Sequence, residues 1–157
     1  MAYLYIVDDD EPPKPLPSRE EAEAEIADWQ RRIDALYDEV VGWLPPGEGY
    51  EVDRSRLLPR HENMQKILEL PGYEIPLLRI RRDGRDILMF QPDARWVLFT
   101  RGRVNLYVGT IRAGDRLLAK EADAEGPEWK YRTTGGWQPG GKPWNRECLL
   151  DLLREVR

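Results

Sequence analysis

The sequence predicts an α+β fold in which N-terminal helices precede an antiparallel β-meander of five to six strands and a C-terminal helix. Apolar residues at helical spacing near both ends of the chain, and regularly spaced turn dipeptides between them, carry this prediction. The 157 residues fit a single α+β domain, residues 1–157. Within it we expect a strand and an acidic, proline-rich connector at 1–17, a helical part at 18–72, the antiparallel sheet at 75–133, and a glycine-rich loop with the closing helix at 134–157.

The first helix has the clearest signals. Residues 3–7 read Tyr-Leu-Tyr-Ile-Val and predict a short strand, and the prolines that follow exclude a helix before Ser18. Ser18 and Glu21 then have the spacing of a capping box, in which each side chain accepts a hydrogen bond from the other residue's backbone amide. One apolar face follows, and Pro45-Pro46-Gly47 ends the helix. That face consists of Ile26, Trp29, Ile33, Leu36, Val40 and Trp43.

Two shorter helices are also predicted. One lies between Pro59 and Leu70, with Met64, Ile67 and Leu68 facing inward, and Pro71-Gly72 ends it. The closing helix begins after Asn145, whose short polar side chain suits an N-cap. Its apolar face comprises Cys148, Leu149, Leu152, Leu153 and Val156.

Turn dipeptides divide the middle of the chain into short segments typical of antiparallel strands joined by hairpins. They are Asp83-Gly84, Pro92-Asp93, Arg101-Gly102, Gly114-Asp115 and Glu125-Gly126. The expected strands are 77–82, 86–91, 95–100, 104–112, 116–121 and 128–133. Segments 87–90 and 96–99 are apolar on both faces and should be central. The aspartates at 83, 86, 93 and 115 are interpreted as turn residues.

Composition limits the classes of protein. No segment resembles a secretory signal or approaches the roughly 20 apolar residues of a membrane span. The single cysteine, Cys148, excludes an internal disulfide, and the single histidine, His61, excludes a multi-histidine metal site. We therefore expect a cytoplasmic protein with no metal and no cofactor. The net charge of -5 combines an acidic first half with a basic second half, and such a split suits electrostatic docking.

The main candidate site is an aromatic and arginine-rich surface on the predicted sheet. Its members are Arg79, Arg81, Arg95, Arg101, Arg103, Arg112, Trp96, Tyr107, Trp129 and Tyr131. Our leading hypothesis is a small protein-interaction domain of the immunity, inhibitor or accessory-subunit type, because no catalytic motif is present and aromatic and arginine side chains are enriched at interfaces. The expected partner contacts are Trp137, Trp129, Tyr131, Arg101 and Arg103.

The alternative is a nucleic-acid-contacting module that uses Arg79, Arg81, Arg103 and Trp96, because aromatics stack on bases and guanidinium groups pair with phosphates. A nuclease-like enzyme is a weaker alternative, and we predict no catalytic residue. The same pattern also fits an ordinary sheet with solvated arginines on one face and aromatics in the core. Adjacent residues point about 100° apart on a helix, so Glu62 is not expected to orient His61. Residues 8–11 fit an acidic linker better than a cation site.

Overall fold

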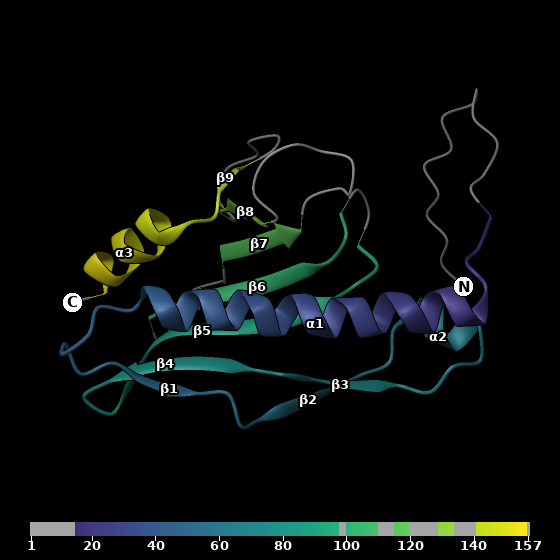
Figure 1. Ribbon diagram of the computed structural model, residues 1–157, viewed down its shortest axis with the longest axis horizontal. Helices are drawn as coiled ribbons and strands as arrows, with labels where there is room; N and C mark the ends of the chain where they lie inside the picture. The colour runs from purple at the N-terminus through teal and green to yellow at the C-terminus, as the bar shows by residue number, and fades with distance from the viewer. Residues whose placement is uncertain (1–14, 98–99, 110–114, 120–128, 134–140, 157) are drawn as a thin grey trace.

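The computed structural model describes residues 15–97, 100–109, 115–119, 129–133 and 141–156 (Figure 1). The predicted strand at 3–7, most of the glycine-rich loop and Trp137 lie outside these residues. The described elements are α1 (Arg19–Trp43), β1 (Glu51–Asp53), β2 (Leu57–Arg60), α2 (Asn63–Ile67), β3 (Tyr73–Pro76), β4 (Leu78–Arg82), β5 (Arg85–Ala94), β6 (Arg103–Val108), β7 (Asp115–Ala119), β8 (Trp129–Arg132), β9 (Lys142–Pro143) and α3 (Arg146–Glu155). The α+β class is confirmed.

Helix α1 begins at the predicted capping box. The Ser18 hydroxyl accepts a hydrogen bond from the Glu21 amide at 3.0 Å, and the Glu21 carboxylate accepts one from the Ser18 amide at 3.4 Å. The helix ends at Trp43, where Leu44 turns to an extended backbone ahead of Pro45. Its buried stripe consists of Ala22, Ile26, Trp29, Ile33, Leu36, Tyr37 and Val40. Helix α3 likewise starts where predicted, because the Asn145 side chain accepts from the Cys148 amide at 3.0 Å.

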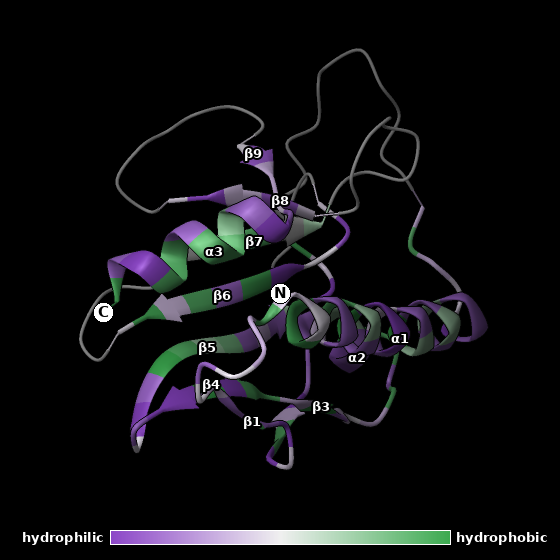
Figure 2. Cartoon of the chain, turned by 60° about the vertical axis from the view of Figure 1, so that its left-hand side comes forward, coloured by the Kyte–Doolittle hydropathy of each residue, from purple (hydrophilic) through white to green (hydrophobic). Residues whose placement is uncertain are grey.

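The main sheet is antiparallel throughout, with the strand order β1-β4-β5-β6-β7-β8-β9. Strands β4 to β8 are the predicted meander. Strand β1 pairs with one edge and β9 with the other, while β2 and β3 form a separate two-stranded sheet. Helices α1 and α3 lie on one side of the main sheet (Figure 2). Between them and the sheet lies the core, which includes Phe90, Leu106, Leu117, Trp129 and Leu149.

Three local predictions are wrong. The segment 18–72 contains strands β1 and β2, which are stabilised by pairing with β4 and β3 rather than by a strong local pattern. Helix α2 is shorter than expected, and it buries Gln65 while Ile67 remains 38% exposed. Finally, the described part of 95–100 is not a strand, because β5 continues to Ala94 and the chain then bends.

Tyr37 joins the two sheets where they separate. Its hydroxyl lies 2.7 Å from the Pro76 carbonyl oxygen in β3 and 3.2 Å from the Phe90 carbonyl oxygen in β5. Both oxygens accept from the one phenolic proton, so the hydroxyl links a backbone carbonyl of each sheet to helix α1. Burial of the ring raises the pKa of Tyr37 well above its ordinary value.

We expect Tyr37 to make the protein sensitive to alkaline pH. A phenol whose pKa is raised by folding contributes stability that is complete below the ordinary pKa of 10.0 and is lost as pH rises above it. Tyr37→Phe should lower the free energy of unfolding by about 1–2 kcal/mol near neutral pH. Urea unfolding at about pH 8 and about pH 11 compares stability on the two sides of the ordinary tyrosine pKa. Between these two pH values, the free energy of unfolding should fall less for Tyr37→Phe than for the wild type. An equal loss in both proteins would contradict this role.

Candidate interaction surface

One face of the main sheet is not covered by any of the described helices. Because side chains alternate along a strand, the residues between the buried positions point to this side. We call them the open face, and its described members are Glu51, Asp53, Arg79, Arg81, Asp86, Met89, Gln91, Asp93, Arg103, Asn105, Tyr107, Lys130 and Arg132. The alternate residues of the same strands point to the helices and are buried. They include Leu78, Ile80, Leu88, Phe90, Val104 and Leu106.

Asp86 holds two arginines at one end of the open face. Nη2 of Arg79 lies 2.9 Å from each oxygen of the Asp86 carboxylate, and Nε of Arg79 lies 3.2 Å from one of them. Nε of Arg81 lies 3.4 Å from the same carboxylate. The hydrogen bonds to Asp86 raise the pKa of Arg79, whose guanidinium therefore stays charged. A bulge between Ile80 and Arg81 shifts the register and places Asp86 opposite Arg81.

A second ion pair lies at the other end of β5 and β6. Nε of Arg103 donates to the Asp93 carboxylate at 2.8 Å, and Nη2 of Arg103 donates to the same oxygen. Asp93 is the extra residue of a bulge between Pro92 and Ala94. The side chains of Arg103 and Asp93 are 28% and 34% exposed. Such half-exposed pairs contribute little to stability, and both side chains are partly accessible to a partner.

Between the two ion-pair clusters lie two cross-strand pairs. Met89 is directly opposite Tyr107, and Gln91 is directly opposite Asn105. All four side chains are half-buried. A thioether and an aromatic ring surrounded by polar groups resemble the centre of a protein interface, where apolar anchors lie inside a polar rim.

Asp53 fixes the acidic edge of the open face on β1. Its carboxylate accepts from the Ser55 hydroxyl at 2.6 Å and from the Ser55 amide at 2.9 Å. These hydrogen bonds lower the pKa of Asp53, and the charges of Arg79 and Arg81 lower it further. The carboxylate is therefore ionised near neutral pH.

The structure brings together only some of the predicted site residues. Arg79, Arg81 and Arg103 share the open face. Trp129 and Tyr131 point the other way and are only 4% and 6% exposed. They belong to the core and are not part of the open face.

Two further predicted residues lie away from the open face. Arg101 is directed to α1, where Nη2 lies 3.4 Å from the Asp28 carboxylate, and its carbonyl accepts from Nη1 of Arg32 at 2.9 Å. The Trp96 ring lies under the Arg95 guanidinium, with 5.8 Å from Cζ to the ring centroid. The arginines and aromatics therefore occupy several sites rather than one surface.

Sequence reasoning missed the carboxylates of the open face. The interpretation of Asp86 and Asp93 as turn residues is wrong, because both lie within β5. Period-two alternation from Leu88 and Phe90 could have placed Asp93 beside Arg103. It could not have placed Asp86, because the bulge between Ile80 and Arg81 reverses the side to which that residue points.

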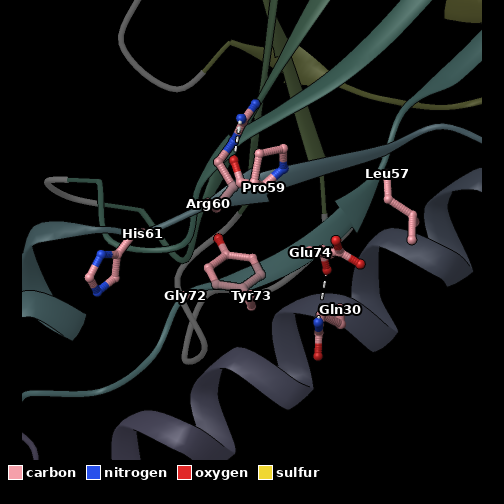
Figure 3. Close-up of a pocket in the computed structure, with 8 residues that line it drawn as sticks. All are labelled: Gln30, Leu57, Pro59, Arg60, His61, Gly72, Tyr73 and Glu74. Atoms are coloured by element: carbon pink, nitrogen blue, oxygen red, sulfur yellow. Dashed lines mark hydrogen bonds between the residues drawn. The ribbon is translucent and has the colours of Figure 1, made fainter.

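A groove of about 780 Å³ lies at the two-stranded sheet beside α1 (Figure 3). It is lined by Gln30, Leu57, Pro59, Arg60, His61, Gly72, Tyr73 and Glu74. Nε2 of His61 lies 3.0 Å from the Leu70 carbonyl oxygen, whereas the Glu62 carboxylate hydrogen-bonds to Tyr73, Arg95 and Trp96. His61 and Glu62 are therefore not an acid–base pair. Within the described ranges, no three His, Cys, Asp or Glu side chains are grouped as metal ligands.

Comparison with known proteins adds no relationship. No protein-family model, curated protein or solved structure matches this chain. Among the described helices, none combines the length and hydrophobicity that spanning a bilayer requires.

Proposed function

We propose that the chain is a cytoplasmic protein-interaction domain, of the immunity, inhibitor or accessory-subunit type, that binds a protein partner through the open face. The observation that carries the proposal is the arrangement around Met89 and Tyr107. A half-exposed apolar and aromatic centre is flanked on both sides by guanidinium–carboxylate pairs, on a sheet face that no described helix covers. Such a face offers an apolar anchor and charges of both signs, which together give affinity and orientation to a protein contact.

The pairing of charges favours a protein over a nucleic acid. Phosphate binding needs guanidinium groups whose charge is not already compensated. On the open face Asp86 lies against Arg79 and Arg81, and Asp93 lies against Arg103. Each carboxylate would repel a phosphate approaching its arginine. A protein partner, in contrast, can present an acid to the arginine and a base or amide to the carboxylate. The nucleic-acid and nuclease-like alternatives remain predictions, and no contact among the described residues favours either of them.

The first test is capture of a stoichiometric partner from the native host after nuclease treatment, followed by affinity measurements with variants. Tyr107→Ala and Arg103→Ala should each weaken the affinity for the partner by about tenfold or more, because both side chains border the centre of the face. Arg154→Ala is the matched control, since Arg154 forms an exposed ion pair with Asp151 on α3, across the sheet from the open face.

Three outcomes of that test would contradict the proposal. One is a partner that binds both open-face variants as tightly as the wild type. Another is a partner whose affinity falls only with the Arg154 control. The third is bound material that disappears with nuclease and whose affinity falls steeply with salt, which would favour the nucleic-acid alternative instead.

A further inference from the structure

The charges of the open face are separated toward two diagonally opposite corners. Strand β1 contributes Glu51 and Asp53 at one edge, where they are directly opposite Arg81 and Arg79 of β4. Those two arginines are also held by Asp86. Three carboxylates and two guanidinium groups therefore lie in this corner, so its net charge is negative.

The basic corner lies on β8, across the sheet. Lys130 and Arg132 both belong to the open face by their register with β7. Through β7, Lys130 is in line with Arg103, and Arg132 is in line with Asn105. Glu51 and Asp53 are thus separated from Lys130 and Arg132 both across the strands and along them. This displacement puts the acidic and basic corners on one diagonal of the face.

A two-fold axis can superpose these corners. If two copies pack face to face, a two-fold axis that lies in the interface and crosses that diagonal at its midpoint, at a right angle, brings each acidic corner onto the partner's basic corner. A two-fold interface is self-complementary, so both contacts form at once. By register, the midpoint falls on β5 and β6, near Met89 and Tyr107. The apolar centre of one copy then meets the apolar centre of the other.

The dimensions of the sheet are adequate for such an interface. Seven strands spaced by about 4.8 Å make a face roughly 30 Å wide. With strands of two to ten residues at about 3.3 Å per residue, the face covers roughly 550 Å², which suits a weak, reversible dimer rather than an interface that buries about 800 Å² on each partner. Sheets also pack face to face in sandwich proteins, with interdigitating side chains.

We propose that the partner of the open face is a second copy of this chain, docked about a two-fold axis that brings the acidic corner of each copy onto the basic corner of the other. This inference rests on the proposed function, because it uses the same surface. It adds the identity of the partner and predicts which charges meet.

The test is a charge exchange between the two corners. Glu51→Lys and Lys130→Glu reverse one charge at each corner, and among the described residues neither side chain has an ion-pair partner. Sedimentation equilibrium of the full chain, from about 1 µM to several hundred µM, should show a monomer–dimer equilibrium for the wild type. Each variant should dimerise about tenfold more weakly or worse, because like charges meet twice in the symmetric dimer. An equimolar mixture should recover part of the loss, because one of its two corner contacts is native and the other contains the exchanged pair.

Glu39→Lys and Arg31→Glu are the matched controls. Both residues are exposed on α1, and these variants carry the same changes in net charge. They should dimerise like the wild type. A wild-type chain that stays monomeric throughout the concentration range would overturn the inference, as would equal weakening by the controls or no recovery in the mixture. A monomer that still captures a different protein, with loss of affinity in Tyr107→Ala, would refute self-association while leaving the proposed function intact.

Discussion

Replacement of Gly102 by alanine is expected to destabilise the protein by about 3–5 kcal/mol, because the new methyl group would overlap the Trp29 ring and strain the backbone. A Cβ atom at Gly102 would lie 2.3 to 2.8 Å from three carbons of that indole. The residue also has a φ of 134°, a conformation that residues other than glycine rarely adopt.

Neither side of this contact can move easily. The Gly102 amide donates to the Thr100 hydroxyl at 3.1 Å, and its carbonyl accepts from the Ala119 amide at 2.9 Å. Trp29 is fully buried, and its ring lies 5.9 Å from that of Trp129 and 5.7 Å from the Arg32 guanidinium. The ring is therefore enclosed by other groups, and moving it away from a new methyl group would displace packed side chains.

Gly49→Ala separates steric overlap from backbone strain. Gly49 also has a positive φ, 80°, but a Cβ there would have no atom within 4 Å. Its replacement should cost about 1 kcal/mol, the usual penalty for alanine in that conformation. Urea or thermal unfolding of both variants measures the difference. Equal losses for the two would show that Trp29 can yield and that packing beside Gly102 is not tight.

The segment that leads to Gly102 also shows which features of the fold can be predicted from the sequence and which cannot. The capping box at Ser18 and the N-cap at Asn145 are local signals, so the starts of α1 and α3 were predicted correctly. Residues 95–100, in contrast, are rich in strand-forming side chains, yet their described part bends, and the Thr100 amide donates to the Val97 carbonyl. The cause lies elsewhere in the chain, because the Glu62 carboxylate binds the amides of Arg95 and Trp96.

The candidate site was predictable to a similar degree. Alternation along 77–82 puts Arg79 and Arg81 on one side of the strand and Leu78 and Ile80 on the other, and β4 has this arrangement. Alternation could also have shown that Trp129 and Tyr131 share one side of β8, but not that this side faces the helices. Strand β1 has only three residues, which is too short for a pattern of alternating polar and apolar side chains to be recognised. Glu51 and Asp53 of β1 were therefore not predicted, although they form one corner of the open face.

Removal of the Glu62 carboxylate should have the second large effect on stability. This carboxylate connects three parts of the chain. It belongs to the residue that precedes α2, and it accepts from the Tyr73 hydroxyl of β3 at 2.5 Å and from the amides of Arg95 and Trp96 at 3.1 Å each. Hydrogen bonds to charged acceptors are the stronger kind. Glu62→Ala should therefore lower the free energy of unfolding by about 2–4 kcal/mol.

Three further variants isolate the origin of that effect. Glu62→Gln preserves the shape but replaces one acceptor oxygen by a donor, so it should lose about half as much. Tyr73→Phe removes one donor and should cost about 1 kcal/mol. Glu74→Ala is the control, because this exposed glutamate on β3 should change stability by less than about 0.5 kcal/mol.

Three measurements decide whether Glu62 acts through these contacts. In a double-mutant cycle, Glu62→Ala and Tyr73→Phe should be coupled by about 1 kcal/mol, because each removes the other's partner. Burial, and then the negative charge of Glu62, raises the pKa of Tyr73, so Glu62→Gln should lower the pKa of that phenol relative to the wild type. Hydrogen exchange at the amides of Arg95 and Trp96 should also become faster in Glu62→Ala. Unchanged exchange at both amides, together with additive stabilities, would mean that the bend after β5 is held by Gly102 and Trp29 rather than by Glu62.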